Sequence, residues 1–224
     1  MRAIRSAGIA LVLTAALAAG LWLYSRGWHP SDSQFPTQGI DVSHHQGRIQ
    51  WPLLKAQGVD FAYIKASEGG DFRDPMFASN LKGAAQSGIA RGAYHFFTLC
   101  RSGADQAENF INLVPADSRL LPAAVDLEFG GNCAARPSRA ALLRELRIFL
   151  RLVEAHSGKP ALLYLTEEFE IAYRVSEAVD RPLWLRSMVR RPDYGARPWR
   201  IWQASNFRRL RGIEGRVDWN AARP

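Results

Sequence analysis

Two acidic residues, Asp126 and Glu128, stand two positions apart inside a short apolar run, residues 123–129, of the kind that forms a buried parallel strand. Because side chains alternate between the two faces of a strand, both carboxylates are predicted to point the same way, about 6–7 Å apart. Burying two carboxylates is costly unless they are paired, hydrogen-bonded or used in a reaction. Two interpretations follow: acids that meet arginines at a rim, or a pair that performs acid–base catalysis.

Other apolar runs also carry polar groups near their ends. Asp41 lies in the first run, Glu68 follows the second, Tyr94 and His95 lie near the end of the third, and Asp218 lies in the last. A cleft lined by carboxylates and aromatic rings suits a sugar polymer, because carboxylates perform acid–base chemistry on a glycosidic bond. The aromatic residues available to stack on sugar rings are Trp51, Tyr63, Tyr94, Trp184, Trp199, Trp202 and Trp219.

The elements that must position these groups alternate along the chain. Strand-like segments cover residues 39–43, 61–66, 90–97, 123–129, 160–165, 183–187, 199–204 and 217–219. Helical patterns cover residues 51–57, 75–87, 104–113, 138–156 and, more weakly, 166–179. Alternation predicts an α/β fold with a parallel sheet, and about eight strands predict closure into a TIM-barrel-like (β/α) barrel. The barrel is expected to be irregular, because its C-terminal part leaves little room for helices.

Length and charge narrow the class of protein. With 224 residues and 47% hydrophobic content, the chain can bury one substantial core. The net charge is +8, but three positive charges lie in residues 1–26, where no acid occurs, so the remainder carries +5. The late basic residues, in 186–200 and 208–211, are interleaved with prolines and apolar residues. We therefore expect no nucleic-acid partner.

The N-terminus indicates export. Arg2 and Arg5 precede an apolar run over residues 7–24, which is long enough to cross a bilayer. A signal peptide cleaved after the small-residue site at 16–18 is the alternative, although the apolar run continues past that site. We expect a periplasmic or extracytoplasmic domain, anchored in the inner membrane by this segment.

Three regions follow from this interpretation. Residues 1–26 form a membrane anchor or signal segment, and residues 27–38, with two prolines and two serines, form a linker. Residues 39–224 form the catalytic barrel.

Cys100 and Cys133 each follow a predicted strand by a few residues, so both would lie at the same strand end. A disulfide is expected in an oxidising compartment, and a pair of free thiols is the alternative.

Six segments together resemble the motif series of glycoside hydrolase family 25, the lysozyme (N-acetylmuramidase) family. They are GIDVSHHQG (39–47), FAYIKASEG (61–69), GAYHF (92–96), VDLE (125–128), IWQ (201–203) and VDWN (217–220). The resemblance covers nearly the whole expected barrel. Two departures are visible: the family tends to have a small residue and an aromatic where this chain has Arg186-Ser187, and an aromatic where it has Ala204. Both fall near strand ends, where they would alter how the glycan is held.

The resemblance implies cleavage of the β-1,4 bond between N-acetylmuramic acid and N-acetylglucosamine in peptidoglycan. It assigns Glu128 as the general acid and Asp126 as an ionised partner that orients the substrate's acetamido group, with Asp41 and Asp218 as further cleft acids. No cofactor or metal is expected, and the protein is expected to be a monomer. A non-catalytic wall-glycan-binding module and a hydrolase of chitin-like polymer are the alternatives. The residues expected to contact substrate are Tyr63, Glu68, Tyr94, His95, Trp202 and Gln203.

Overall fold

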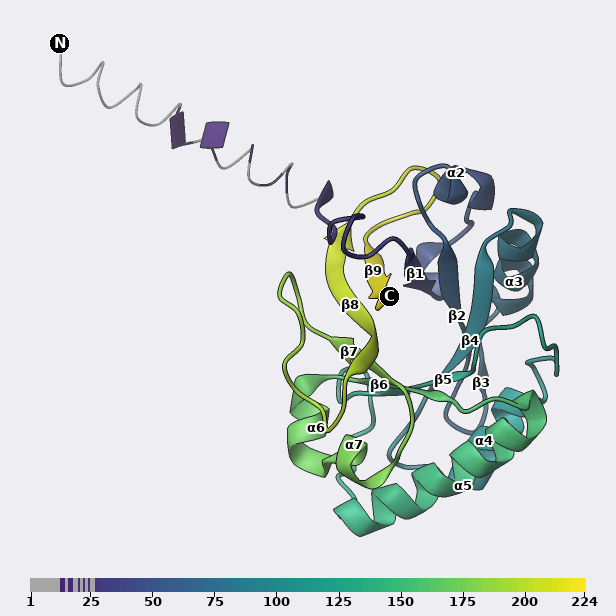
Figure 1. Ribbon diagram of the computed structural model, residues 1–224. Helices are drawn as coiled ribbons and strands as arrows, with labels where there is room; N and C mark the ends of the chain where they lie inside the picture. The colour runs from purple at the N-terminus through teal and green to yellow at the C-terminus, as the bar shows by residue number, and fades with distance from the viewer. Residues whose placement is uncertain (1–12, 15, 18–19, 21, 23, 25–26) are drawn as a thin grey trace.

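In the computed structural model, which describes residues 13–14, 16–17, 20, 22, 24 and 27–224, eight strands close into a barrel (Figure 1). The strands follow the order β1-β9-β8-β7-β6-β5-β4-β2, and pairing of β1 with β2 closes the ring. A short strand, β3 (Phe72–Arg73), adds to β2 outside the ring. The expected irregular (β/α) barrel is confirmed. The barrel strands are β1 (Gln38–Val42), β2 (Phe61–Glu68), β4 (Ala90–Phe96), β5 (Ala124–Leu127), β6 (Leu162–Leu165), β7 (Leu183–Arg186), β8 (Trp199–Arg208) and β9 (Val217–Ala222).

The last strand runs in the opposite direction to the rest. Strand β9 is antiparallel to both β8 and β1, whereas the other neighbouring barrel strands are parallel. Only residues 209–216 connect β8 to β9, and this is too short for the crossover that a parallel pair requires. The start of β9 therefore lies at the same rim as the carboxyl ends of the parallel strands, and this brings Asp218 opposite Asp41 in the β1–β9 ladder.

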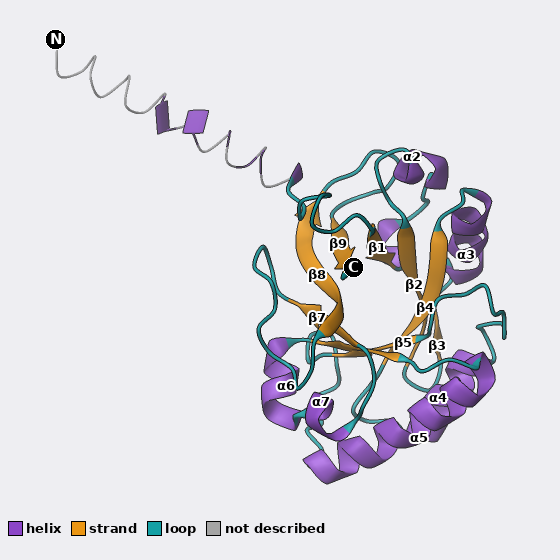
Figure 2. Ribbon diagram, viewed as in Figure 1, coloured by secondary structure: helices purple, strands orange, loops and turns teal. Residues whose placement is uncertain are grey.

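Helices cover the outside of the barrel from β2 to β6 (Figure 2). The longest, α5, begins after Ser138, whose hydroxyl accepts a hydrogen bond from the Ala141 amide, and ends at Gly158 in the left-handed conformation (φ 69°). The helix expected over residues 138–156 is therefore confirmed. The helices are α2 (Trp51–Lys55), α3 (Phe77–Gln86), α4 (Gly103–Ile111), α5 (Arg139–Ser157), α6 (Glu167–Tyr173) and α7 (Val175–Ala178), with a 3-10 turn, η1 (His44–Gln46).

Large side chains fill the interior of the barrel. Tyr63 packs against Trp184 with ring centroids 5.0 Å apart, and Tyr164 packs against the same indole edge to face, also at 5.0 Å. This layer is a solid floor, and the space above it is what remains for a substrate. Its buried members are Phe61, Tyr63, Ala124, Leu162, Tyr164, Trp184 and Ile201.

The segment expected to be a linker, residues 27–38, is part of the folded unit. Phe35 is buried against Trp199 and Trp202, and Trp28 contacts Trp202 edge to face. The prediction of a free linker is wrong, and the reason lies at the other end of the chain. No helix follows α7 in residues 179–224, so the outer face of β8 lacks helical cover and the aromatic residues of the N-terminal segment bury it instead.

The expected anchor or signal segment over residues 1–26 lies largely outside the described residues. Within the residues that are described, no helix combines the length and the apolar character needed to span a bilayer.

Candidate active site

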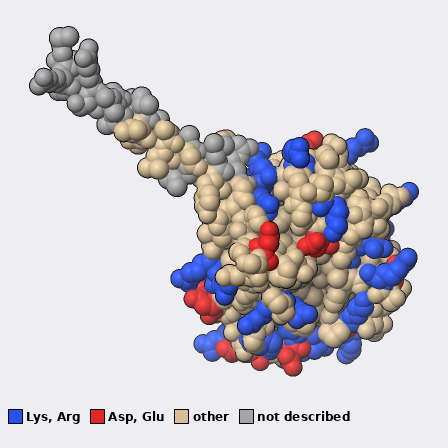
Figure 3. All heavy atoms as spheres, turned by 45° about the horizontal axis from the view of Figure 1, so that its top comes forward, with Lys and Arg blue, Asp and Glu red and all other residues tan. Residues whose placement is uncertain are grey.

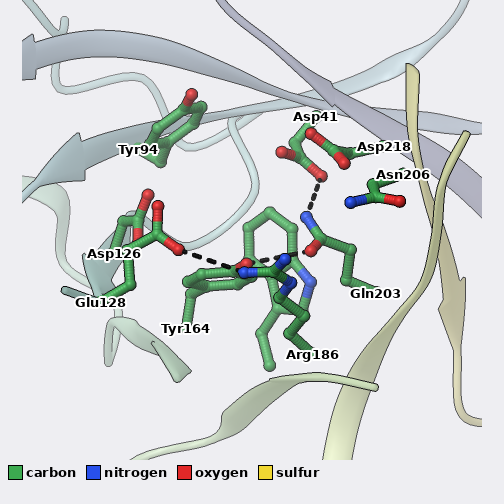
Figure 4. Close-up of a pocket in the computed structure, with 10 residues that line it drawn as sticks. Asp41, Tyr94, Asp126, Glu128, Tyr164, Arg186, Gln203, Asn206 and Asp218 are labelled. Atoms are coloured by element: carbon green, nitrogen blue, oxygen red, sulfur yellow. Dashed lines mark hydrogen bonds and ion pairs between the residues drawn. The ribbon is translucent and has the colours of Figure 1, made fainter. Parts of the chain in front are cut away.

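Four carboxylates meet at one rim of the barrel (Figure 4). Asp41 comes from β1, Asp126 from β5, Glu128 from the position directly after β5, and Asp218 from the start of β9. We call these four residues the acid cluster. Asp126 and Glu128 reach the same cleft because of the two-residue alternation, whereas Asp41 and Asp218 reach it because β1 and β9 are paired.

The cleft consists of two adjoining halves that share the acid cluster and Tyr94. The arginine half, of about 240 Å³, is lined further by Tyr164, Trp184, Arg186, Gln203 and Asn206. The lysine half, of about 430 Å³, is lined further by Val42, Ser43, His45, Gln46, Lys65, Glu68, Phe96, Gly130 and Gly131. The carboxylates thus stand where the two halves join, with polar groups extending into both.

Asp41 is the member of the cluster that is best supplied with hydrogen bonds. Its Oδ2 accepts one from Asn220 Nδ2 at 2.7 Å and one from Gln203 Nε2 at 3.1 Å. The Oε1 of Gln203 in turn accepts from the Tyr164 hydroxyl at 2.9 Å, which fixes the amide orientation. These donors favour the ionised form of Asp41 and hold it in one place.

Burial raises the pKa of every carboxyl group in the cluster. Chiefly for this reason, the pKa of Glu128 is raised to about 7 and that of Asp218 to about 8. Burial also raises the pKa of Asp41, although its bonds to Asn220 and Gln203 oppose the change. The cluster therefore retains protons near neutral pH, as a general acid must.

Asp126 was expected to be ionised, but its surroundings favour the protonated carboxyl group. Burial, followed by the charges of Glu128 and Asp41, raises its pKa well above the ordinary value. Its Oδ1 is buried and has no hydrogen-bond partner among the residues that the structure describes. An unpaired buried carboxylate oxygen favours the protonated form, and a donor brought by a ligand would reverse that preference.

Three of the six residues expected to contact substrate line the cleft: Glu68, Tyr94 and Gln203. Glu68 forms an ion pair with Lys65 at 2.6 Å, within the lysine half. Tyr94 lines both halves, and Gln203 holds Asp41 as described.

The structure places the other three, Tyr63, His95 and Trp202, outside the cleft. Tyr63 belongs to the floor and donates its hydroxyl hydrogen to the Pro122 carbonyl. His95 is fully buried against Phe149 of α5, bonds Ser67 and Gln106, and has its pKa lowered to about 3 by burial. Trp202 packs outward against the N-terminal segment. Each of the last two stands beside a cleft residue in its strand, so alternation directs it away.

Four lining residues of the arginine half were not among the six expected substrate contacts: Tyr164, Trp184, Arg186 and Asn206. Trp184 was expected only as one of several aromatic residues that could stack on a sugar ring. Arg186 is the last residue of β7, and it is the strand-end departure from the family pattern that was expected to alter how the glycan is held. Tyr164 and Trp184 lie within apolar runs, where nothing in the local sequence distinguishes a lining residue from a core residue.

A disulfide ties two loops at the same rim. Cys100 and Cys133, with Cα atoms 6.4 Å apart, join the loops that follow β4 and β5. Asn132 strengthens the link, because its Oδ1 accepts from the Leu99 amide and its Nδ2 donates to the Phe97 carbonyl. The loop after Glu128 is thereby fixed to its neighbour. Across the described residues, no group of three or more His, Cys, Asp or Glu side chains is arranged to hold a metal ion.

Comparison with known families and structures accounts for this arrangement. The sequence model described as "Glycosyl hydrolases family 25" matches residues 40–213. The chain belongs to glycosyl hydrolase family 25. It is therefore a glycoside hydrolase, and the resemblance seen in its six motifs is confirmed.

Members of family 25 with known names or structures resemble the chain over most of its length. Lysozyme M1 of Streptomyces globisporus is 34% identical over 204 residues, which cover 85% of this chain and 69% of that protein. The structure of a family 25 glycosyl hydrolase from Bacillus anthracis superposes with a TM-score of 0.79 at 34% identity, covering 87% of this chain and 91% of the other. A bacterial lysozyme from Streptomyces coelicolor gives 0.76 at 33% identity, covering 83% and 91%.

Proposed function

We propose that this protein is a peptidoglycan hydrolase that cleaves the β-1,4 bond between N-acetylmuramic acid and N-acetylglucosamine. The observation that carries the proposal is the acid cluster at the junction of the two cleft halves. A sugar chain that lies across both halves would bring one glycosidic bond next to Glu128. The name of the relative Lysozyme M1 supports the choice of substrate.

Glu128 is proposed as the general acid. Its carboxyl group lines both halves, and its pKa of about 7 keeps it protonated in neutral to weakly acidic solution. In the first step it would donate its proton to the glycosidic oxygen as the bond from C1 to that oxygen breaks. The resulting carboxylate would then accept a proton from the water that completes hydrolysis.

Asp126 is proposed to assist the substrate's own acetamido group. The acetamido carbonyl oxygen would attack C1 and form a cyclic oxazolinium intermediate, which water then opens to leave a muramic acid reducing end. During this step the nitrogen of the acetamido group gains positive character. The unpaired Oδ1 of Asp126 could accept a hydrogen bond from that N–H, and the bond would favour the ionised carboxylate.

The test is to incubate the purified protein with peptidoglycan and identify the products by mass spectrometry. We expect fragments with a muramic acid reducing end, absent when Glu128→Gln replaces the wild type. Glu177→Gln, which removes an exposed carboxylate on α7, is the matched control and should cleave normally. Cleavage of chitin oligosaccharides in place of peptidoglycan would reassign the substrate. Intact glycan that co-sediments with the protein would instead indicate a wall-binding module.

We further propose that the protein acts outside the cytoplasm as a monomer, held at the inner membrane by residues 1–26. The support is the sequence of that segment, with arginines before a long apolar run. One chain supplies all four residues of the acid cluster, so a monomer would suffice for the proposed reaction. Carbonate extraction of membranes tests the anchor: release of the protein into the wash would contradict it.

A further inference from the structure

Arg186 is a positive charge at the edge of the acid cluster with a role still unassigned. It ends β7, and its Nη1 lies 3.6 Å from Glu128 Oε2. In Figure 4 its side chain reaches into the space between Glu128 and Gln203. It is the only basic residue among those that line the arginine half, and its side chain is 35% exposed to solvent.

The backbone of Arg186 is fixed, whereas its guanidinium is free to bind. The Arg186 amide donates to the Tyr194 hydroxyl oxygen at 2.9 Å, and that hydroxyl lies 2.7 Å from the Leu165 carbonyl oxygen to which it donates. Within the described part of the chain, however, the guanidinium makes no hydrogen bond, and the pair with Glu128 is its one ion pair. A guanidinium carries five N–H donors in a planar fork that matches a carboxylate. Most of its binding capacity therefore faces the cleft unused.

The pairing with Glu128 also opposes the chemistry proposed for that residue. A nearby positive charge favours the ionised carboxylate, whereas a general acid must hold its proton. A second carboxylate in the cleft would resolve this conflict, because it would draw the guanidinium away from Glu128. The glycan strands of peptidoglycan carry such groups beside the bond to be cut.

We propose that Arg186 determines specificity by binding a carboxylate of peptidoglycan, which displaces Glu128 from the guanidinium. This inference rests on the proposed function. The carboxylate has two possible sources: the lactyl group of muramic acid, when no peptide is attached, and the acidic residues of the stem peptide. Both sources present the same planar carboxylate anion, and a comparison of intact peptidoglycan with peptide-stripped strands distinguishes them.

The experiment measures kcat/KM of the full-length protein on two pairs of substrates. One pair is intact peptidoglycan before and after its carboxylates are amidated with carbodiimide and ammonia. The other is peptide-stripped glycan strands, treated in the same way. We expect the wild type to prefer the carboxylate form by about tenfold or more in at least one pair, as for charge-assisted hydrogen bonds. A preference confined to stripped strands identifies the lactyl group, and one confined to intact peptidoglycan identifies the stem peptide.

The variants decide whether Arg186 is responsible. Arg186→Gln should bring the preference close to one, and Arg186→Lys should retain part of it. Lysine and arginine side chains lie at several places on the face drawn in Figure 3, so a control for general attraction to an anionic polymer is needed. Arg151→Gln removes an exposed charge on α5 and should keep the wild-type preference.

Two results would overturn the proposal: equal rates of the wild type on both members of each pair, or an unchanged preference in Arg186→Gln. Absence of cleavage in all four substrates would defeat the proposed function alone. In that case the dissociation constants of the wild type and of Arg186→Gln are measured for the carboxylate and the amidated form of each substrate. A preference for the carboxylate form that is lost in Arg186→Gln then supports the role of Arg186, and an unchanged preference contradicts it.

Discussion

Replacing Glu128 by glutamine should remove turnover and at the same time stabilise the fold above neutral pH. The pKa of Glu128 is raised from an ordinary value of 4.5 to about 7, so the unfolded chain releases this proton before the folded one. Stability therefore declines as the pH rises from about 4.5 to 7 and stays level above that range. At about 1.4 kcal/mol for each pH unit, the cost of the ionised group is about 3 kcal/mol. A neutral glutamine avoids it.

Thermal unfolding of the two proteins at pH 4 and at pH 8 measures this difference. The gain of about 3 kcal/mol corresponds to a rise in Tm of about 6–12 °C at pH 8, because each kcal/mol shifts a domain of this size by about 2–4 °C. At pH 4 the two Tm values should nearly coincide. Turnover of peptidoglycan should fall by at least about 100-fold, the lower limit for loss of a general acid.

Glu68→Gln is the matched control, because it removes a carboxylate from the same cleft with the opposite consequence. Lys65, whose side chain is only 10% exposed, would lose its partner at 2.6 Å, so the Tm should fall. The reasoning is refuted if Glu128→Gln is no more stable than the wild type at pH 8, or if its gain is the same at pH 4. Retained turnover would refute the role of Glu128 as acid.

Further predictions concern catalysis, the rim and one strained residue. The kcat/KM of the wild type should fall as the pH rises through about 7, because Glu128 then loses the proton that it donates; a profile that stays flat to pH 9 would contradict this. Asp126→Asn should lower kcat by about 10²–10³ with an unchanged circular dichroism spectrum. Cys100→Ser, which opens the link to Cys133 across 33 residues, should lower the free energy of unfolding in urea by about 3–4 kcal/mol. Val189→Gly should raise it by about 1 kcal/mol, because Val189 is half exposed at φ 66°, a conformation that a β-branched residue adopts only with strain.

The fold could be predicted where local pattern and chain length decide it. The apolar spacing in α5, with Ser138 before it and Gly158 after it, defines that helix without reference to the rest of the chain. Alternation of strands and helices likewise predicts a barrel. The packing of residues 27–38 could not be predicted in this way, because it depends on the bare outer face of β8, more than 160 residues away.

The same distinction applies to the site. Asp126 and Glu128 share a cleft because of a two-residue period within one strand, so their pairing is visible locally. The same period could have excluded His95 and Trp202, which stand beside the cleft residues Tyr94 and Gln203. The position of Tyr63 is not visible locally, because in a barrel both the inner and the outer face of a strand are buried. Apolar character therefore does not distinguish the floor or the outer layer from the cleft wall.

The sequence by itself determined the class of fold, the family and the four acids, since each depends on residue types and on spacings along the chain. Only the tertiary structure decided which groups surround those acids. The reversal of β9 brings Asp218 opposite Asp41, and the curvature of the sheet brings Arg186 of β7 within 3.6 Å of Glu128. Burial among these neighbours then sets the proton affinities of the cluster, because the cost of a charge depends on everything that displaces water around it.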